Sequence, residues 1–309
     1  MPRVLCTRGE IRLLTLVAPA KVNLYLAVGQ RRPDGYHDLT TVFQALELAD
    51  VVRVDPDDSF SVTYEPDLGI PRGEDLVSLV SMALAQRLGR ELQGAFTVYK
   101  RIPAAGGLGG GSSDAAATIV ALCAMWGVPA ETPEVVDVAR AVGADVAFFL
   151  VGGTALYTGR GDTLVRRLPD PGLDVVVINP GEPVPTAAAY AAFDRLLLPP
   201  APPVEPLLGA LASTGTNIGG LLFDNLTEAS TGMVPSVGGA LAFLRSEPGV
   251  LGAEMAGSGS TVFALCPTPE VASSIAEKAR DRGWWSAVTR TSPSGARIVR
   301  TEEGDAWLG

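Results

Sequence analysis

Residues 103–114, Pro-Ala-Ala-Gly-Gly-Leu-Gly-Gly-Gly-Ser-Ser-Asp, hold five glycines within six positions and lead into an alanine-rich run that ends near Trp126. Glycine lets backbone N–H groups turn toward one point without side chains in the way. The helix predicted by the following run adds unpaired N–H donors and the positive end of its dipole at the same place. The stretch therefore predicts a cradle for a polyphosphate.

This stretch differs from the two commonest phosphate-binding loops. A P-loop ends in Gly-Lys followed by Ser or Thr, and no lysine follows Gly111. The dinucleotide fingerprint requires a third glycine where Ser112 stands. A flexible linker is the simplest alternative. However, a linker joins domains, whereas this stretch joins a strand-like alternation between Phe96 and Ile102 to a predicted helix.

The composition is that of a soluble, folded and acidic protein. Of 309 residues, 47% are hydrophobic and 19% are charged, and 34 acidic against 24 basic side chains give a formal charge of −10. This balance disfavours nucleic acid or an anionic membrane as the main partner. No apolar run reaches the roughly 18 residues of a membrane helix, and residues 1–10 lack the apolar core of a signal peptide. Cys6, Cys123 and Cys266 suit a reducing cytoplasm and form no metal-binding pattern.

Periodicity predicts strands and helices that are mixed without regular alternation, which is typical of the α+β class. The predicted strands are 12–17, 21–28, 39–48, 51–54 and 175–178, and the predicted helices are 74–90, 112–126, 133–142 and 270–282. A hairpin turn is expected over residues 157–162, and an irregular loop over the proline-rich residues 199–203. The length allows two domains of ordinary size.

Three ordered stretches resemble the motifs of the GHMP kinases, the superfamily named for galactokinase, homoserine kinase, mevalonate kinase and phosphomevalonate kinase. They are residues 18–24 (Ala-Pro-Ala-Lys-Val-Asn-Leu), the glycine-rich stretch, and residues 256–263 (Ala-Gly-Ser-Gly-Ser-Thr-Val-Phe). The resemblance implies a small-molecule kinase that uses ATP with Mg²⁺. It also implies an N-terminal domain similar to the second domain of ribosomal protein S5 over residues 1–165. A ferredoxin-like C-terminal domain would follow over residues 166–309.

By this resemblance, backbone N–H groups of the second and third motifs bind ATP. The residues concerned are Pro103, Ala104, Ala105, Gly106, Gly107, Leu108, Gly109, Gly110, Gly111, Ser112, Ser113, Gly257, Ser258 and Gly259. Either Ser112 or Ser113 could touch a phosphate or a magnesium ion, and the sequence does not separate these roles. Asp114 stands where a carboxylate simply complements the helix dipole, so we leave it out of the catalytic set. No protein-held metal site is predicted.

Lys21 and Asp145 are the predicted catalytic residues. Lys21 stands among apolar strand residues, where an ammonium ion either reaches solvent at the strand end or has a functional partner, because its burial alone is costly. Asp145 precedes an apolar run, where an aspartate is also a good helix N-cap. The resemblance implies that the two side chains face each other across the acceptor hydroxyl, with Asp145 accepting its proton.

The acceptor is predicted from residues 34–37, Asp-Gly-Tyr-His. His37 is the only histidine in the chain, and a lone histidine is more often structural than catalytic. Beside Tyr36 and after a tight turn, it suits recognition of a nucleobase by stacking and hydrogen bonding. The resemblance implies a cytidine diphosphate derivative of a sugar alcohol, with Tyr36 and His37 at the cytosine. Asn23 and Asp145 would then contact the sugar-alcohol end.

Several alternatives remain open at this stage. Tyr190 matches an aromatic position that would stack on the other face of the base, and it also suits an ordinary helix core. The enzyme could act on another small alcohol, such as mevalonate or homoserine. A non-catalytic nucleotide sensor is a third possibility, although it need not keep both Lys21 and Asp145. The chain is expected to be a monomer or a homodimer.

Overall fold

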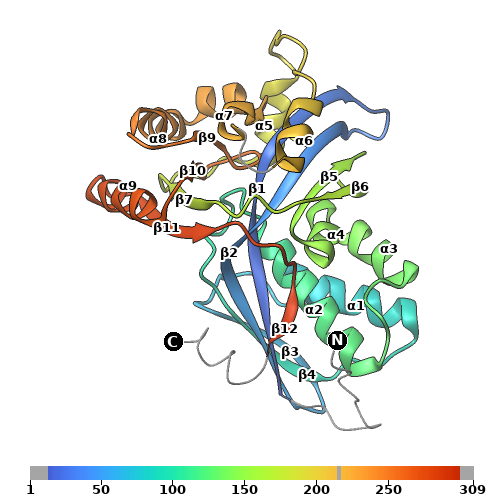
Figure 1. The fold of residues 1–309 in the computed structure, drawn as a ribbon. Coiled ribbons are helices and arrows are strands. Elements are labelled where there is room, and N and C mark those ends of the chain that lie inside the picture. The colour runs from blue at the N-terminus through green and yellow to red at the C-terminus, as the bar shows by residue number, and fades with distance from the viewer. Residues whose placement is uncertain (1–12, 214–216, 300–309) are drawn as a thin grey trace.

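The computed structural model describes residues 13–213 and 217–299, which form an α+β structure on two sheets, confirming the predicted fold class (Figure 1). The first sheet has the order β12-β1-β2-β4-β3, with β5 and β6 continuing from β2 and β8 lying beside β1. Its strands are β1 (Leu14–Arg31), β2 (His37–Asp55), β3 (Phe60–Glu65), β4 (Gly94–Tyr99), β5 (Thr154–Thr158), β6 (Thr163–Leu168), β8 (Phe223–Asp224) and β12 (Arg297–Val299).

The two longest strands, β1 and β2, form one antiparallel hairpin that extends along the molecule (Figure 1). Its register runs from Leu14 opposite Val54 to Arg31 opposite His37, with a shift just after Pro19. The prediction of four short strands here is wrong. A β-bulge takes up the irregularity at the proline, so the ladder continues beyond it instead of ending.

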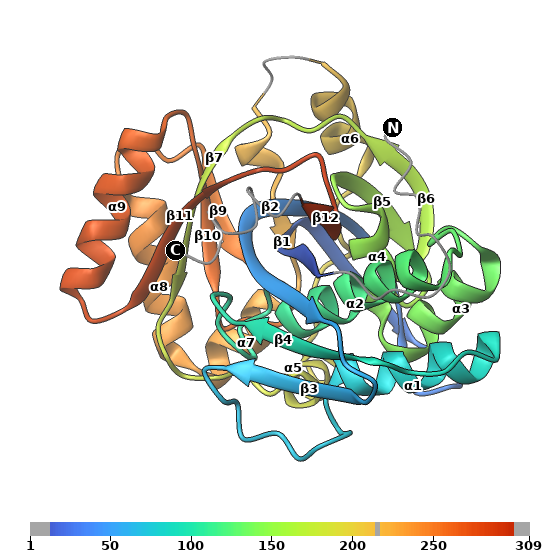
Figure 2. The ribbon, with the colours of Figure 1, turned by 90° about the horizontal axis from the view of Figure 1, so that it is seen from below.

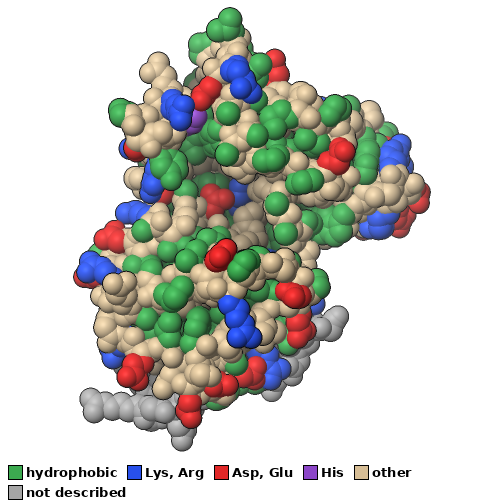
Figure 3. Space-filling model, turned by 180° about the vertical axis from the view of Figure 1, so that it is seen from behind, with side chains coloured by type: hydrophobic (Ala, Val, Ile, Leu, Met, Phe, Trp, Pro, Cys, Tyr) green, Lys and Arg blue, Asp and Glu red, His purple; other side chains and the backbone are tan. Residues whose placement is uncertain are grey.

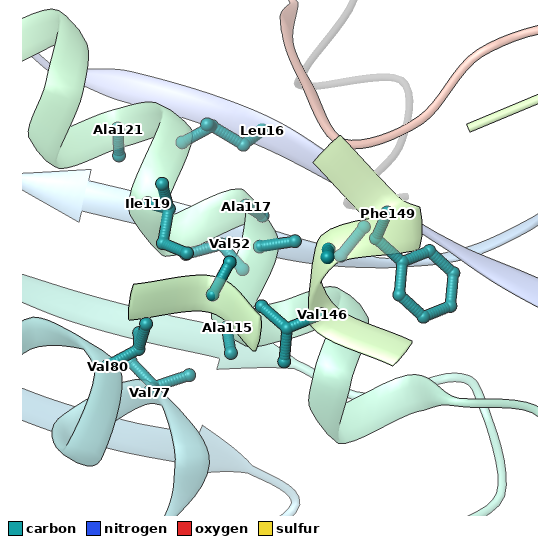
Figure 4. Close-up of a cluster of buried hydrophobic side chains, with 14 of the residues drawn as sticks. Leu16, Val52, Val77, Val80, Ala115, Ala117, Ile119, Ala121, Val146 and Phe149 are labelled. Carbon is teal, nitrogen blue, oxygen red and sulfur yellow. The ribbon is translucent and has the colours of Figure 1, made fainter. Parts of the chain in front are cut away.

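Helices α1 (Leu76–Leu88), α2 (Gly110–Trp126), α3 (Pro133–Val142) and α4 (Ala144–Val151) gather on one side of the first sheet (Figure 2). The alanines of α2 pack closely among Val77 and Val80 of α1, Val146 of α4 and Leu16 of β1 (Figure 4). Their small size lets α2 approach its neighbours without voids. α1 ends as predicted at Gly89, whose φ of 60° is readily adopted by glycine.

The second sheet has the order β11-β7-β10-β9, and all its neighbouring strands are antiparallel. Its strands are β7 (Asp174–Asn179), β9 (Gly252–Met255), β10 (Val262–Cys266) and β11 (Trp285–Arg290). α8 (Pro235–Ser246) packs against β9 and β10, and α9 (Pro269–Asp281) packs against β7 and β11. The remaining helical segments are α5 (Thr186–Phe193), α6 (Glu205–Ala212), η1 (Gly219–Leu221) and α7 (Thr227–Met233).

A shared hydrophobic core joins the two sheets. Ala20, Val22 and Leu24 of β1 lie in the same buried cluster as Val175 of β7 and Phe263 of β10. Because successive side chains of a strand point to opposite faces, the residues between these three point away from the shared core. This alternation directs the side chains of Lys21 and Asn23 toward the same side of β1.

The chain passes from the first sheet to the second between β6 and β7, and later returns to the first sheet through β8 and β12. We retain the predicted division near residue 165 as a proposal. The helices predicted over 74–90, 112–126, 133–142 and 270–282 are confirmed to within two residues at each end. None of the helices in the described ranges is long and apolar enough to cross a membrane.

Candidate active site

The glycine-rich stretch forms the loop between β4 and α2. Gly107 and Gly109 have φ values of 81° and 73°, which lie in the left-handed region that favours glycine. α2 begins at Gly110, and no side chain caps its first N–H groups. These donors and the positive end of the helix dipole therefore point to an anion site at this end of α2.

The third motif approaches this loop from the second sheet, at the turn between β9 and β10. A Cβ atom on Gly107 would lie 2.0 Å from the backbone oxygen of Ala256, so only glycine permits the approach. The N–H of Thr261 donates to the backbone oxygen of Gly106 at 3.1 Å. Gly257 has a φ of 59° and turns the backbone toward Lys21. Two glycine-rich turns, far apart in the sequence, thus form one surface.

Lys21 extends from β1 beside this surface. Its backbone N–H donates to the oxygen of Leu108 at 3.0 Å, which ties the strand to the glycine loop. The residue is only 4% exposed. Its Nζ donates to Oδ1 of Asn23 at 2.9 Å and lies 3.7 Å from Oδ2 of Asp145. Nδ2 of Asn23 donates in turn to Oγ1 of Thr41 at 2.8 Å, so the position of the ammonium group is fixed.

Asp145 is the second residue of α4, and the N-cap of that helix is Gly143. The predicted N-cap role of Asp145 is therefore wrong. Its side chain is 31% exposed, and its distance to Nζ of Lys21 is longer than a hydrogen bond. A carboxylate that is held near an ammonium group and is open on one side has the geometry to accept a proton from a bound hydroxyl.

These residues line a cavity of about 270 Å³, and the surface is hollowed between the two parts of the molecule (Figure 3). The lining comes from β1 and β2, from the second and third motifs, from α4 and α5, and from the turn between β5 and β6. It comprises Lys21, Asn23, Leu26, Leu39, Thr41, Phe43, Gly107, Gly109, Ala144, Asp145, Arg160, Gly161, Thr186, Tyr190, Gly257 and Ser258. The other predicted nucleotide-loop residues lie outside this lining.

The three residues predicted to hold a base do not all lie together. Tyr190 lines the cavity, and burial raises the pKa of its hydroxyl. His37 is 7% exposed, and its Nε2 lies 2.7 Å from Oδ1 of Asp194. Its ring packs against Tyr190, with centroids 5.2 Å apart. Tyr36 is 56% exposed and stands outside the lining, beneath the guanidinium of Arg160 at 5.1 Å.

Arg160 is a site residue that the sequence did not reveal. The pattern of residues 157–162 indicated only a hairpin turn. The structure brings that turn to the cavity, where Arg160 is held by Asp162 at 2.9 Å. It is the side chain that connects exposed Tyr36 to the cavity wall. No sequence signal distinguishes it from other surface arginines.

Asp114 differs from its prediction. It is the fifth residue of α2 and lies beyond the first turn, where it is 1% exposed and 2.6 Å from Nζ of Lys100. Asp50 of β2 contacts the same ammonium group. Ser113 is also buried, and its Oγ has no hydrogen-bond partner among the described residues, whereas Ser112 is half-buried. The sequence could not predict this cluster because its members come from three separate elements.

Comparisons with known proteins agree with this architecture. The family described as GHMP kinases N terminal domain matches residues 75–153, and GHMP kinases C terminal matches residues 205–283. A 4-diphosphocytidyl-2-C-methyl-D-erythritol kinase from Nocardioides sp. is 38% identical, covering 91% of this chain and 98% of the relative. The corresponding kinase of Pelotomaculum thermopropionicum is 38% identical, with coverages of 90% and 98%.

Solved structures extend the comparison. A crystal structure of 4-(cytidine 5'-diphospho)-2C-methyl-D-erythritol kinase has a TM-score of 0.74 and 36% identity, covering 90% of this chain and 100% of that one. Homoserine kinase from Cytophaga hutchinsonii has a TM-score of 0.72 at 21% identity, with coverages of 96% and 100%, and shares the fold alone.

The fold and the three-motif site thus define a small-molecule kinase of the GHMP superfamily. Within it, the chain belongs to the family of 4-diphosphocytidyl-2-C-methyl-D-erythritol kinases.

Proposed function

We propose that this enzyme transfers the γ-phosphate of ATP to the 2-hydroxyl of 4-diphosphocytidyl-2-C-methyl-D-erythritol, in the non-mevalonate route to isoprenoid precursors. The observation that carries the proposal is the Lys21–Asp145 pair, which faces a cavity bounded by both glycine-rich turns. The products would be ADP and the 2-phosphorylated compound. Magnesium would enter with ATP as part of the substrate, and we assign it no protein ligand.

Asp145 would act as the general base. Its carboxylate accepts the proton of the acceptor hydroxyl while the hydroxyl oxygen forms a bond to the γ-phosphorus. The bond from that phosphorus to the bridging oxygen breaks, and ADP leaves with the electron pair. Lys21, oriented by Asn23, stabilises the negative charge on the transferring group.

The nucleotide phosphates would lie against the backbone of the glycine loop, near the start of α2. There, N–H groups and the helix dipole attract negative charge without a competing side chain. Ser258 lines the same cavity, and its Oγ lies 3.0 Å from Oγ1 of Thr186. This contact joins the third motif to α5 and would help to close the turn against the phosphates.

For the acceptor, Asn23 and Asp145 would contact the methylerythritol end, and the cytosine would lie toward Tyr190. Nε2 of His37 is already hydrogen-bonded to Asp194, so we propose that Nδ1 is the ring nitrogen that contacts the base. Tyr36 would provide the second aromatic face, with Arg160 beside it. Cys123 and Cys266 form no disulfide, which fits a cytoplasmic location.

The test is ADP release by the purified protein, with ATP and Mg²⁺, against 4-diphosphocytidyl-2-C-methyl-D-erythritol, mevalonate and homoserine. Turnover confined to the cytidine compound is the expected result. CDP should compete with that acceptor more strongly than UDP does. Turnover with mevalonate or homoserine alone would overturn the substrate assignment. ATP binding without transfer to any acceptor would replace the kinase with a nucleotide sensor.

A further inference from the structure

A second lysine–carboxylate group lies beneath the glycine loop and takes no part in the proposed chemistry. Lys100, the residue after β4, contacts Asp50 of β2 and lies 2.6 Å from Oδ2 of Asp114 in α2. The three side chains are 7%, 0% and 1% exposed, respectively. The cluster is therefore closed to solvent, whereas the Lys21–Asp145 pair opens into the cavity.

The cluster connects the two ends of the loop. Lys100 immediately precedes residues 101–113, and Asp114 immediately follows them. Oδ1 of Asp50 accepts hydrogen bonds from the backbone N–H groups of Arg101, at 2.5 Å, and Ile102, at 2.9 Å. One buried carboxylate thus fixes the backbone where the loop begins. The hydrogen bond from Nζ of Lys100 to Oδ2 of Asp114 fixes the start of α2, just beyond the end of the loop.

The fit of the cluster under α2 depends on Gly110. A Cβ atom there would lie 3.2 Å from Nζ of Lys100 and 3.3 Å from Oδ2 of Asp50. The preceding glycine, Gly109, packs against Phe149 and the other lysine, because its Cβ would lie 2.8 Å from Cζ of Phe149 and 3.1 Å from Cγ of Lys21. Gly110 therefore contacts the buried cluster, and its neighbour Gly109 lines the cavity. A change in the geometry of the cluster is thus passed to the cavity through adjacent residues.

We propose that Lys100 and Asp114 are positioning residues that hold the glycine loop closed, and that this closure sets the affinity for the phosphates of ATP. The inference rests on the proposed function, because it takes this loop as the nucleotide cradle. A cradle of backbone N–H groups binds strongly when its groups are already in place. Otherwise, the free-energy cost of ordering the loop reduces the free energy gained on binding.

The charge balance of the cluster allows a positioning role to be tested separately from an effect on overall stability. Two carboxylates share one ammonium group, and burial together with Asp50 raises the pKa of Asp114 to about 8. Asp114 therefore holds a proton more readily than an ordinary aspartate does, and asparagine can imitate this protonated form. Removing the Asp114 side chain leaves Lys100 paired with Asp50 in a balanced ion pair. Such a variant should fold and yet lack the connection to α2.

The experiment compares Asp114→Ala, Asp114→Asn and the surface control Lys278→Met, whose lysine pairs with Glu247 away from the loop. ATP affinity is measured by calorimetry, and both KM values and kcat by ADP release. Amide hydrogen exchange over residues 101–113 reports the loop without any ligand. Asp114→Ala should raise the ATP Kd and KM about tenfold and speed loop exchange, with the acceptor KM and kcat within about threefold. Asp114→Asn and Lys278→Met should stay near wild type.

An unchanged ATP Kd in folded Asp114→Ala would overturn the proposal. Equal losses in the alanine and asparagine variants would also overturn it, because the asparagine keeps an oxygen for Lys100. A failure of the proposed function would look different, since wild-type protein would then bind no ATP or transfer no phosphate. In that case, faster exchange of the loop in Asp114→Ala alone would still support its closure by the cluster.

Discussion

The two lysines that contact the glycine loop have opposite surroundings. Lys21 has one hydrogen bond to Asn23 and a carboxylate 3.7 Å away that is 31% exposed. Lys100 lies between two carboxylates that are at most 1% exposed. A separated pair at a cavity can admit a hydroxyl and exchange a proton with it. A closed cluster has no room for a substrate and can only hold its own elements together.

The largest expected effect on stability belongs to the closed cluster. Lys100→Met leaves two buried carboxylates without a cation, so it should lower the free energy of unfolding by about 3–5 kcal/mol. Urea denaturation measures this quantity. Lys278→Met removes a lysine that is 46% exposed and should change this free energy by less than about 1 kcal/mol. Equal losses in the two variants would remove the distinction between the buried and exposed lysines.

Lys21→Met should give the opposite pattern. The loss of a cation that stabilises transferred charge should lower kcat about 10²–10³-fold. Asp145 is 31% exposed and keeps contact with water, whereas Asp50 does not, so the free energy of unfolding should fall by less than in Lys100→Met. Steady-state kinetics and urea denaturation of the same preparation measure both effects. A fully active Lys21→Met enzyme would show that another group stabilises the charge on the transferred phosphate.

A more gradual effect, spread over several pH units, is expected from pH. The folded-state pKa of Asp114, about 8, is above the ordinary value for an aspartate. The folded protein therefore keeps a proton that the unfolded chain has lost, and this group lowers stability as pH rises from about 4 to 8. Its contribution has a slope of up to about 1.4 kcal/mol per pH unit. Asp114→Asn removes it.

Urea denaturation of wild type and Asp114→Asn from pH 5 to pH 9 tests this expectation. The difference in unfolding free energy between the two proteins should shift in favour of the asparagine variant up to about pH 8. It should then level off. Parallel curves over the whole range would show that Asp114 does not titrate with the predicted pKa.

The sequence predicted those parts of the fold that depend on local patterns. The helices were located because their apolar spacing and their terminal residues, such as Gly89, are local signals. The hairpin of β1 and β2 was divided into four strands because Pro19 in β1 and Asp50 in β2 were both read as breaks. Its ladder instead continues past Pro19 by a register shift, which depends on the partner strand rather than on the local sequence.

The site shows the same limit. The motifs predicted the glycine turns, because each motif is a short continuous segment, and the resemblance to the GHMP kinases predicted the pairing of Lys21 with Asp145. Arg160 and the Lys100 cluster were missed, since they acquire their roles only when separate elements pack together. The burial of Asp114 was missed for this reason as well, because a carboxylate at a helix start is usually solvated. The exposed position of Tyr36 was likewise not foreseen.

The most direct test of this account is a single-turnover measurement of ³²P transfer from γ-labelled ATP by Asp145→Asn. ATP affinity is measured on the same preparation. We expect an unchanged ATP Kd and a transfer rate about 10²–10⁴-fold below wild type, because asparagine cannot accept the hydroxyl proton. Transfer at nearly the wild-type rate would contradict Asp145 as the base and, with it, the division of labour between the two lysine–carboxylate groups.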